Sequence, residues 1–109
     1  MEIKIESSVP KQIQIIKLAP LWKSQEELDL VLQNQESKLG ELMNYTVEPY
    51  FLTGIIRYLE KGETIQIRQQ EFFVNDCQPW SGLIEEDTLI ELETGFTYEN
   101  FKQKQIVAD

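Results

Sequence analysis

The chain has 109 residues, which is enough for one domain with its own core and too few for two conventional domains. Its 19 acidic and 10 basic residues give a formal net charge of −9. This charge argues against nucleic acid and anionic membranes as partners, because both are bound through concentrated positive charge. A hydrophobic content of 41% predicts a folded globule rather than a disordered chain.

The N-terminal sequence and the cysteine count bear on the compartment. "MEIKIESS" has the pattern of neither a secretory signal nor an Arg-rich transit peptide. One cysteine cannot form an internal disulfide, and no stretch reaches the roughly 20 apolar residues that insertion into a membrane requires. We therefore predict an intracellular, cytoplasmic protein. A cytoskeletal or ciliary assembly, and an organelle reached by an internal signal, stay open.

Alternation of polar and apolar residues predicts several short strands. Gln12 to Leu18 alternate with the period of a half-buried strand, which Pro20 is expected to end. Four more strands are expected, at 41–51 running into Pro49, at 64–68 after a Lys61-Gly62 turn, at 71–76, and at 88–94. Short strands about ten residues apart, with Gly and Pro turns between them, are typical of a small β-barrel.

One helix is expected between the first two strands, over about 24–39. Ser24 and Glu27 form a capping-box pattern, and Gly40 is a plausible C′ residue. The apolar residues of its predicted inner face are Leu28, Val31, Leu32 and Leu39. The predicted fold class is therefore mostly β with one inserted helix (α+β). Residues 1–100 are expected to form a single barrel domain, and 101–109 a C-terminal tail that docks on a partner.

Cys77 is the first candidate for chemistry. A reactive thiol needs a nearby cation or base, and the chain has no histidine. The neighbouring Asp76 would raise the thiol pKa. We therefore predict a structural cysteine at a strand end.

Metal and catalytic sites are not expected either. One cysteine without histidine cannot form a zinc site. A carboxylate calcium site is possible in composition but lacks the required ligand alternation, and Glu91 and Glu93 are instead expected on the solvated side of a strand. The acids considered for such a site are Glu85, Glu86, Asp87, Glu91 and Glu93. No glycine-rich phosphate loop is present. We expect no enzyme activity, no cofactor, no metal and no small-molecule substrate.

The two tryptophans are candidates for packing or for binding. Trp80 lies in "QPWSG", where it could anchor a protein interface or close the end of the core, and the sequence leaves both open. Trp22, just before the helix, is expected in the core.

The order of motifs from Ile13 to Gly95 resembles the second subdomain of the amino-terminal domain of the valosin-containing-protein family of AAA ATPases. The motifs that carry this resemblance are "IQIIKLAP" (13–20), "PYFL" (49–52), Lys61-Gly62-Glu63, Glu71-Phe72 with Asp76 and Pro79, and "DTLI" (87–90) before Gly95. The resemblance implies a small four-stranded β-barrel that binds protein adaptors, often of the ubiquitin system. After "PYFL" this chain has Thr53-Gly54-Ile55-Ile56 and lacks the aromatic expected there, which argues for a retained scaffold with altered binding surfaces.

Two functions follow from these observations. The first is a non-catalytic protein–protein interaction module, a structural or accessory subunit whose partners are other subunits of a larger assembly. The alternative is a reversible adaptor or peptide-binding protein in a ubiquitin or AAA-unfoldase pathway. The residues expected at the protein interface are Thr53, Gly54, Ile55, Ile56, Tyr58, Trp80, Phe101 and Ile106.

Overall fold

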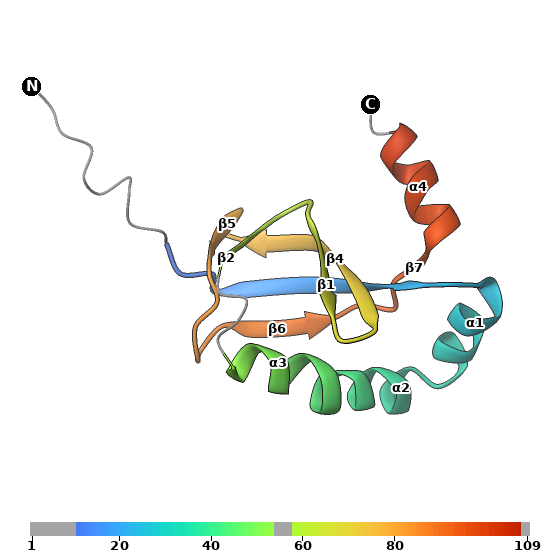
Figure 1. The fold of residues 1–109 in the computed structure, drawn as a ribbon, viewed down its shortest axis with the longest axis horizontal. Coiled ribbons are helices and arrows are strands. Elements are labelled where there is room, and N and C mark those ends of the chain that lie inside the picture. The colour runs from blue at the N-terminus through green and yellow to red at the C-terminus, as the bar shows by residue number, and fades with distance from the viewer. Residues whose placement is uncertain (1–10, 54–57, 108–109) are drawn as a thin grey trace, which may run out of the picture.

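A mixed β-sheet around the central strand β1 (Ile15–Trp22) organises the computed structural model, which describes residues 11–53 and 58–107 (Figure 1). The strand order is β3-β4-β1-β6, and β7 also pairs with β1. The other strands of this sheet are β3 (Thr64–Ile67), β4 (Gln70–Gln78), β6 (Leu89–Leu92) and β7 (Phe96–Thr97). Strand β4 is antiparallel to β1, whereas β6 and β7 are parallel to it. Strands β2 (Tyr58–Glu60) and β5 (Ser81–Leu83) form a separate antiparallel pair.

The predicted α+β class is confirmed, but the predicted closed barrel is not found among the described strands. The hydrogen-bonded path ends at β3 on one side and at β6 on the other. One expected strand is missing from the sheet, because residues 41–51 are helical. The sheet therefore stays open, with the helices packed beside it (Figure 1).

Pro20 lies inside β1, so the prediction that it ends this strand is wrong. On one side of β1, Pro20 pairs with Phe72 of β4. On the other side, the parallel ladder with β6 ends at Leu18, whose carbonyl accepts the N–H of Glu93 at 2.9 Å. The next donor on β1 would be Pro20, which has no N–H. The proline therefore ends the ladder with β6 while the strand continues to its pairing with β7.

Ser24 is the N-cap of the first helix, α1 (Gln25–Gln33), as predicted, but the return bond of the capping box goes to the residue before it. Ser24 Oγ accepts the N–H of Glu27 at 3.3 Å, and Glu27 Oε1 in turn accepts the N–H of Lys23 at 2.8 Å. The helix ends at Asn34, whose φ of −134° and ψ of 49° are not helical. A second helix, α2 (Gln35–Leu42), follows at once and passes through Gly40. The predicted helix end at Leu39, with Gly40 as C′, is therefore wrong.

The helical path continues after α2 through the π-helical segment η2 (Met43–Val47) and α3 (Glu48–Leu52), so the strand predicted over 41–51 is wrong. Pro49 explains the π-helical segment. A proline ring clashes with the carbonyl four residues earlier and cannot donate to it. The chain accommodates this by widening one turn, in which the N–H of Glu48 bonds the Met43 carbonyl, five residues back.

Gly40 provides a test of this helical path. Its added Cβ would meet no atom within 4 Å, and its φ is not in the left-handed region. Alanine in a helix interior is favoured over glycine by about 1 kcal/mol, so Gly40→Ala is expected to raise the free energy of unfolding by about 0.5–1 kcal/mol in urea denaturation. If Gly40 were instead a C′ residue, the same substitution would lower the free energy of unfolding. A loss of stability would therefore contradict a helix that continues through Gly40.

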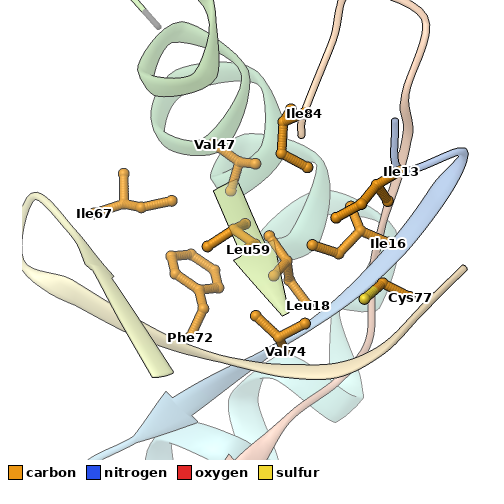
Figure 2. Packing of buried hydrophobic residues seen from close by; sticks show 10 residues of the cluster. All are labelled: Ile13, Ile16, Leu18, Val47, Leu59, Ile67, Phe72, Val74, Cys77 and Ile84. Carbon is orange, nitrogen blue, oxygen red and sulfur yellow. The ribbon is translucent and has the colours of Figure 1, made fainter. Parts of the chain in front are cut away.

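The core lies between one face of the sheet and the inner side of η2 and α3 (Figure 2). Val47 is the helical contribution and is fully buried. The cluster consists of Ile13, Ile16, Leu18, Val47, Leu59, Ile67, Phe72, Val74, Cys77 and Ile84. Strand side chains on alternate positions, such as Phe72 and Val74, share this face. Of the helices in the described ranges, none has the length and apolar character needed to cross a membrane.

Candidate protein-interaction surfaces

Trp80 lies on the turn between β4 and β5, and its side chain is 75% exposed. The turn itself is well anchored, since the Trp80 carbonyl accepts the N–H of Lys61 at 2.7 Å and the Cys77 thiol at 3.0 Å. The peptide bond between Gln78 and Pro79, just before the tryptophan, is cis. Of the two possibilities that the sequence left open, the structure therefore places the ring outside the core.

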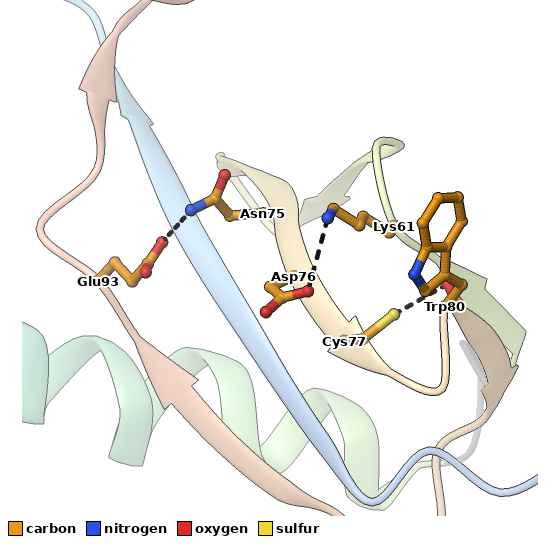
Figure 3. A network of polar contacts seen from close by, with 6 residues as sticks. All are labelled: Lys61, Asn75, Asp76, Cys77, Trp80 and Glu93. Carbon is orange, nitrogen blue, oxygen red and sulfur yellow. Dashed lines mark hydrogen bonds and ion pairs between the residues drawn. The ribbon is translucent and has the colours of Figure 1, made fainter.

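Lys61 connects this exposed ring to the acidic strand β4 (Figure 3). Its Nζ lies 5.4 Å from the centre of the Trp80 ring and 3.8 Å from Asp76 Oδ1. A cation over an indole face is attractive, and the two contacts together restrict both side chains. The exposed tryptophan thus has one attractive contact within the chain, with a lysine that also pairs with β4.

Cys77 is buried beneath this turn, with 1% of its surface exposed. Burial raises the pKa of its thiol, and the nearby Asp76 carboxylate raises this pKa further. Both effects disfavour the reactive thiolate. The prediction of a structural cysteine at a strand end is confirmed, because Cys77 packs in the core near the end of β4.

The predicted interface segment 53–58 is only partly described. Tyr58, in β2, is 51% exposed and pairs with Leu83 of β5. Thr53 is exposed at the end of α3, where its hydroxyl donates to the Tyr50 carbonyl at 2.6 Å. Gly54, Ile55 and Ile56 lie outside the described residues.

The predicted C-terminal tail begins within a helix, α4 (Tyr98–Val107). Phe101 is half-buried, and its ring packs edge-on against Phe73 of β4, with 4.9 Å between ring centres and an angle of 60°. The Tyr98 hydroxyl donates to Glu71 Oε1 at 2.6 Å, and burial together with this carboxylate raises the pKa of Tyr98 to about 12. The start of α4 is thus attached to this chain's own sheet. The side chain of Ile106 lies outside the described part, so docking of this tail on a partner stays a prediction.

The predicted interface residues do not form one surface. Tyr58 and Trp80 belong to the β2–β5 end of the molecule, whereas Phe101 lies on α4 beyond β7, at the other end of the sheet (Figure 1). Trp22, expected in the core, is half-buried at the end of β1, and its indole N–H donates to the Thr94 carbonyl at 2.8 Å.

The acidic residues of the β5–β6 region are spread along loops and strands. Asp87 accepts a hydrogen bond from Gln12. Glu93 Oε1 accepts one from Asn75 at 2.7 Å, on the face of the sheet away from the core (Figure 3). Glu91 is exposed on the same side of β6 as Glu93. Within residues 11–53 and 58–107, no group of three His, Cys, Asp or Glu side chains is placed to hold a metal ion.

A groove of about 520 Å³ lies between the helical path and β6. We call it the β6 groove. Its lining consists of Met43, Glu48, Phe51, Leu52, Ile84, Glu85, Glu86, Thr88, Leu89 and Ile90. Leu52 on its edge is 81% exposed, and Leu89 is also exposed.

The sequence interpretation missed this groove because it assigned 41–51 to a strand. A signal was present in the spacing of Met43, Val47 and Phe51, which recur every four residues as on one face of a helix. A helix with this inner face leaves Tyr45 on its outer side and Leu52 at the edge of the groove, and both are exposed. The chain matches no protein-family model, no curated protein and no solved structure.

Proposed function

We propose that this protein is a non-catalytic protein-interaction module that acts inside the cell as a small structural or accessory subunit of a larger assembly. The observation that carries the proposal is the exposed indole of Trp80. Tryptophan is among the residues most enriched at the energetic centres of protein interfaces. Here it is 75% exposed on a turn whose backbone is anchored by two hydrogen bonds to its carbonyl.

The rigidity of this turn favours binding over a packing role. A side chain that is already restricted loses less conformational entropy when a partner covers it. The pairing of β2 with β5 fixes the backbone that carries the ring, and the contact with Lys61 favours one orientation of the indole. Tyr58, exposed on the same strand pair, adds a second aromatic side chain to this end of the molecule.

Trp80→Ala tests the proposal. Loss of an anchoring tryptophan typically costs 2 kcal/mol or more of binding free energy, about 30-fold in affinity. We expect the partner that co-purifies with the full chain from cell extract to fall at least tenfold in quantitative mass spectrometry of the variant. The free energy of unfolding should change by less than about 0.5 kcal/mol, because the ring is exposed.

Tyr45→Ala is the matched control, since Tyr45 is another exposed aromatic, on η2. It should leave the captured partner unchanged. Equal capture by the wild type and by Trp80→Ala, or a wild-type chain that captures no partner, would contradict the proposed function.

The adaptor alternative, like the resemblance to the valosin-containing-protein subdomain, stays a proposal with less support. In this chain, the "PYFL" motif that carries much of the resemblance lies in helix α3 instead of meeting a strand. Binding of adaptor peptides of that family, followed by amide chemical shifts around Thr53 and Tyr58, would test it directly.

A further inference from the structure

One edge of β6 is not covered by any strand in the described parts of the chain. Among the described strands, β6 pairs with β1 alone, and it ends the strand order of the sheet. The N–H groups of Leu89 and Glu93 donate to Gln14 and Leu18, both at 2.9 Å, and therefore point toward β1. Because successive residues of a strand point their backbone groups to opposite sides, the N–H and C=O groups of Ile90 and Leu92 point to the open edge.

The β6 groove runs beside this open edge. Ile90 lines it from the strand, and Met43, Phe51 and Leu52 line it from the helical path. Backbone groups that can pair with an added strand therefore lie next to an apolar hollow that can take a side chain from it. These are the two elements of binding by strand addition, in which main-chain hydrogen bonds give affinity and pockets for alternate side chains give selectivity.

The charges around the groove are of one sign. Among the described residues that line it, Glu48, Glu85 and Glu86 are charged, and none is lysine or arginine. Glu91 is exposed on the opposite face of β6, where the alternate side chains of an added strand would lie. Cross-strand pairs of opposite charge are favourable and like charges directly opposite are unfavourable, so a cationic segment fits this edge and a second copy of this acidic chain does not.

We propose that the open edge of β6 binds an extended segment of a protein partner in which apolar residues alternate with lysine or arginine. The apolar side chains enter the β6 groove against Phe51 and Leu52, and the basic side chains lie over Glu91 on the other face. The glutamates of the groove lining attract the cationic segment as a whole through their field, without direct pairing. The inference goes beyond the proposed function. It uses a surface that does not include Trp80, and it commits to the chemistry of the partner segment.

The test uses the full chain and a synthetic acetylated peptide with three Lys-Leu repeats. Two control peptides separate pattern from charge: one has the same composition with the lysines in one block and the leucines in another, and one alternates glutamate with leucine. We expect the alternating Lys-Leu peptide to slow hydrogen exchange at the amides of Ile90 and Leu92 by about tenfold or more at saturation. Neither control peptide should do so.

Two variants place the binding on the groove. Leu52→Lys and Glu86→Lys alter exposed side chains on the groove lining, so the fold should be retained. Combined in one variant, they should lower the affinity for the Lys-Leu peptide roughly tenfold. Glu26→Lys makes the same charge change as Glu86→Lys, but on α1, outside the groove lining, and should change the affinity less than about twofold.

Four results would overturn the proposal. Protection of Ile90 and Leu92 in the free protein would show that the edge is already covered, and equal protection by the block peptide would show that charge alone drives binding. Chemical shifts confined to Trp80 and its turn would assign the peptide to the surface of the proposed function. Concentration-dependent dimerisation that protects the same two amides would assign the edge to a second copy. Failure of Trp80→Ala to lose its partner would leave this proposal unaffected, because the two surfaces share no residue.

Discussion

Replacing Phe72 by alanine is expected to lower the free energy of unfolding by about 3–5 kcal/mol in urea denaturation. Phe72 is fully buried in β4, and it is the largest of the side chains that are fully buried in the described core. Its removal forfeits the burial of a whole ring and leaves a cavity that the surrounding strands fill only in part. A domain of this length has a total stability of about 5–15 kcal/mol, so this single change should remove a large share of it.

The control for Phe72→Ala is Tyr45→Ala, which also removes an aromatic ring but at a site that is 70% exposed. It should change the free energy of unfolding by less than about 0.5 kcal/mol. Phe72→Leu, which keeps most of the buried volume, should fall between the two. Equal losses for Phe72→Ala and Tyr45→Ala would contradict the position of the core between the sheet and the helical path.

Gly95→Ala is expected to cost about 3 kcal/mol or more of the free energy of unfolding. Gly95 has a φ of +94°, in the left-handed region that side chains other than glycine rarely adopt. Its added Cβ would also lie 2.1 Å from the Pro20 carbonyl oxygen and 2.9 Å from Trp22 Nε1. Because the nearest atom belongs to the backbone of the central strand, the clash cannot be relieved by rotating a side chain.

Gly62→Ala separates the cost of the positive φ from the cost of the steric clash at Gly95. Gly62 has nearly the same φ, +97°, but an added Cβ there meets nothing within 4 Å. Its cost should be limited to the backbone strain, about 1–2 kcal/mol. The difference between the two variants in urea denaturation then measures the close approach of Gly95 to Pro20. Equal costs would show that the chain at Gly95 does not pack against β1 as the structure has it.

The strands with strict alternation could be predicted from the sequence, and the reason is local. Along β3, the apolar Ile65 and Ile67 alternate with polar residues, and this period of two is a property of the extended backbone itself. The turn at Lys61-Gly62 and the capping box at Ser24 were predicted on the same grounds, since each depends on residues no more than three positions apart.

The segment 41–51 could not be predicted correctly, because its local signals conflict. Thr46, Val47 and Tyr50 favour strands by propensity, and Pro49 disfavours a regular helix. Burial of Val47 against strands from both ends of the chain outweighs these preferences, and the widened turn of η2 absorbs the proline. Propensity differences are small compared with the free energy of burying such a side chain.

Some features of the candidate binding surfaces could likewise be predicted from the sequence, and others could not. The sequence by itself pointed to Trp80 as an interface candidate and to Cys77 as a structural residue, because residue identity and short-range context are sufficient for both predictions. The tertiary structure alone decided that the Trp80 ring points outward and that Phe101 packs on Phe73. It also decided that β6 runs parallel to β1 and has an edge that no described strand covers. A pattern of alternating residues fixes which face of a strand is buried, but its pairing partner is chosen by contacts far apart in the chain.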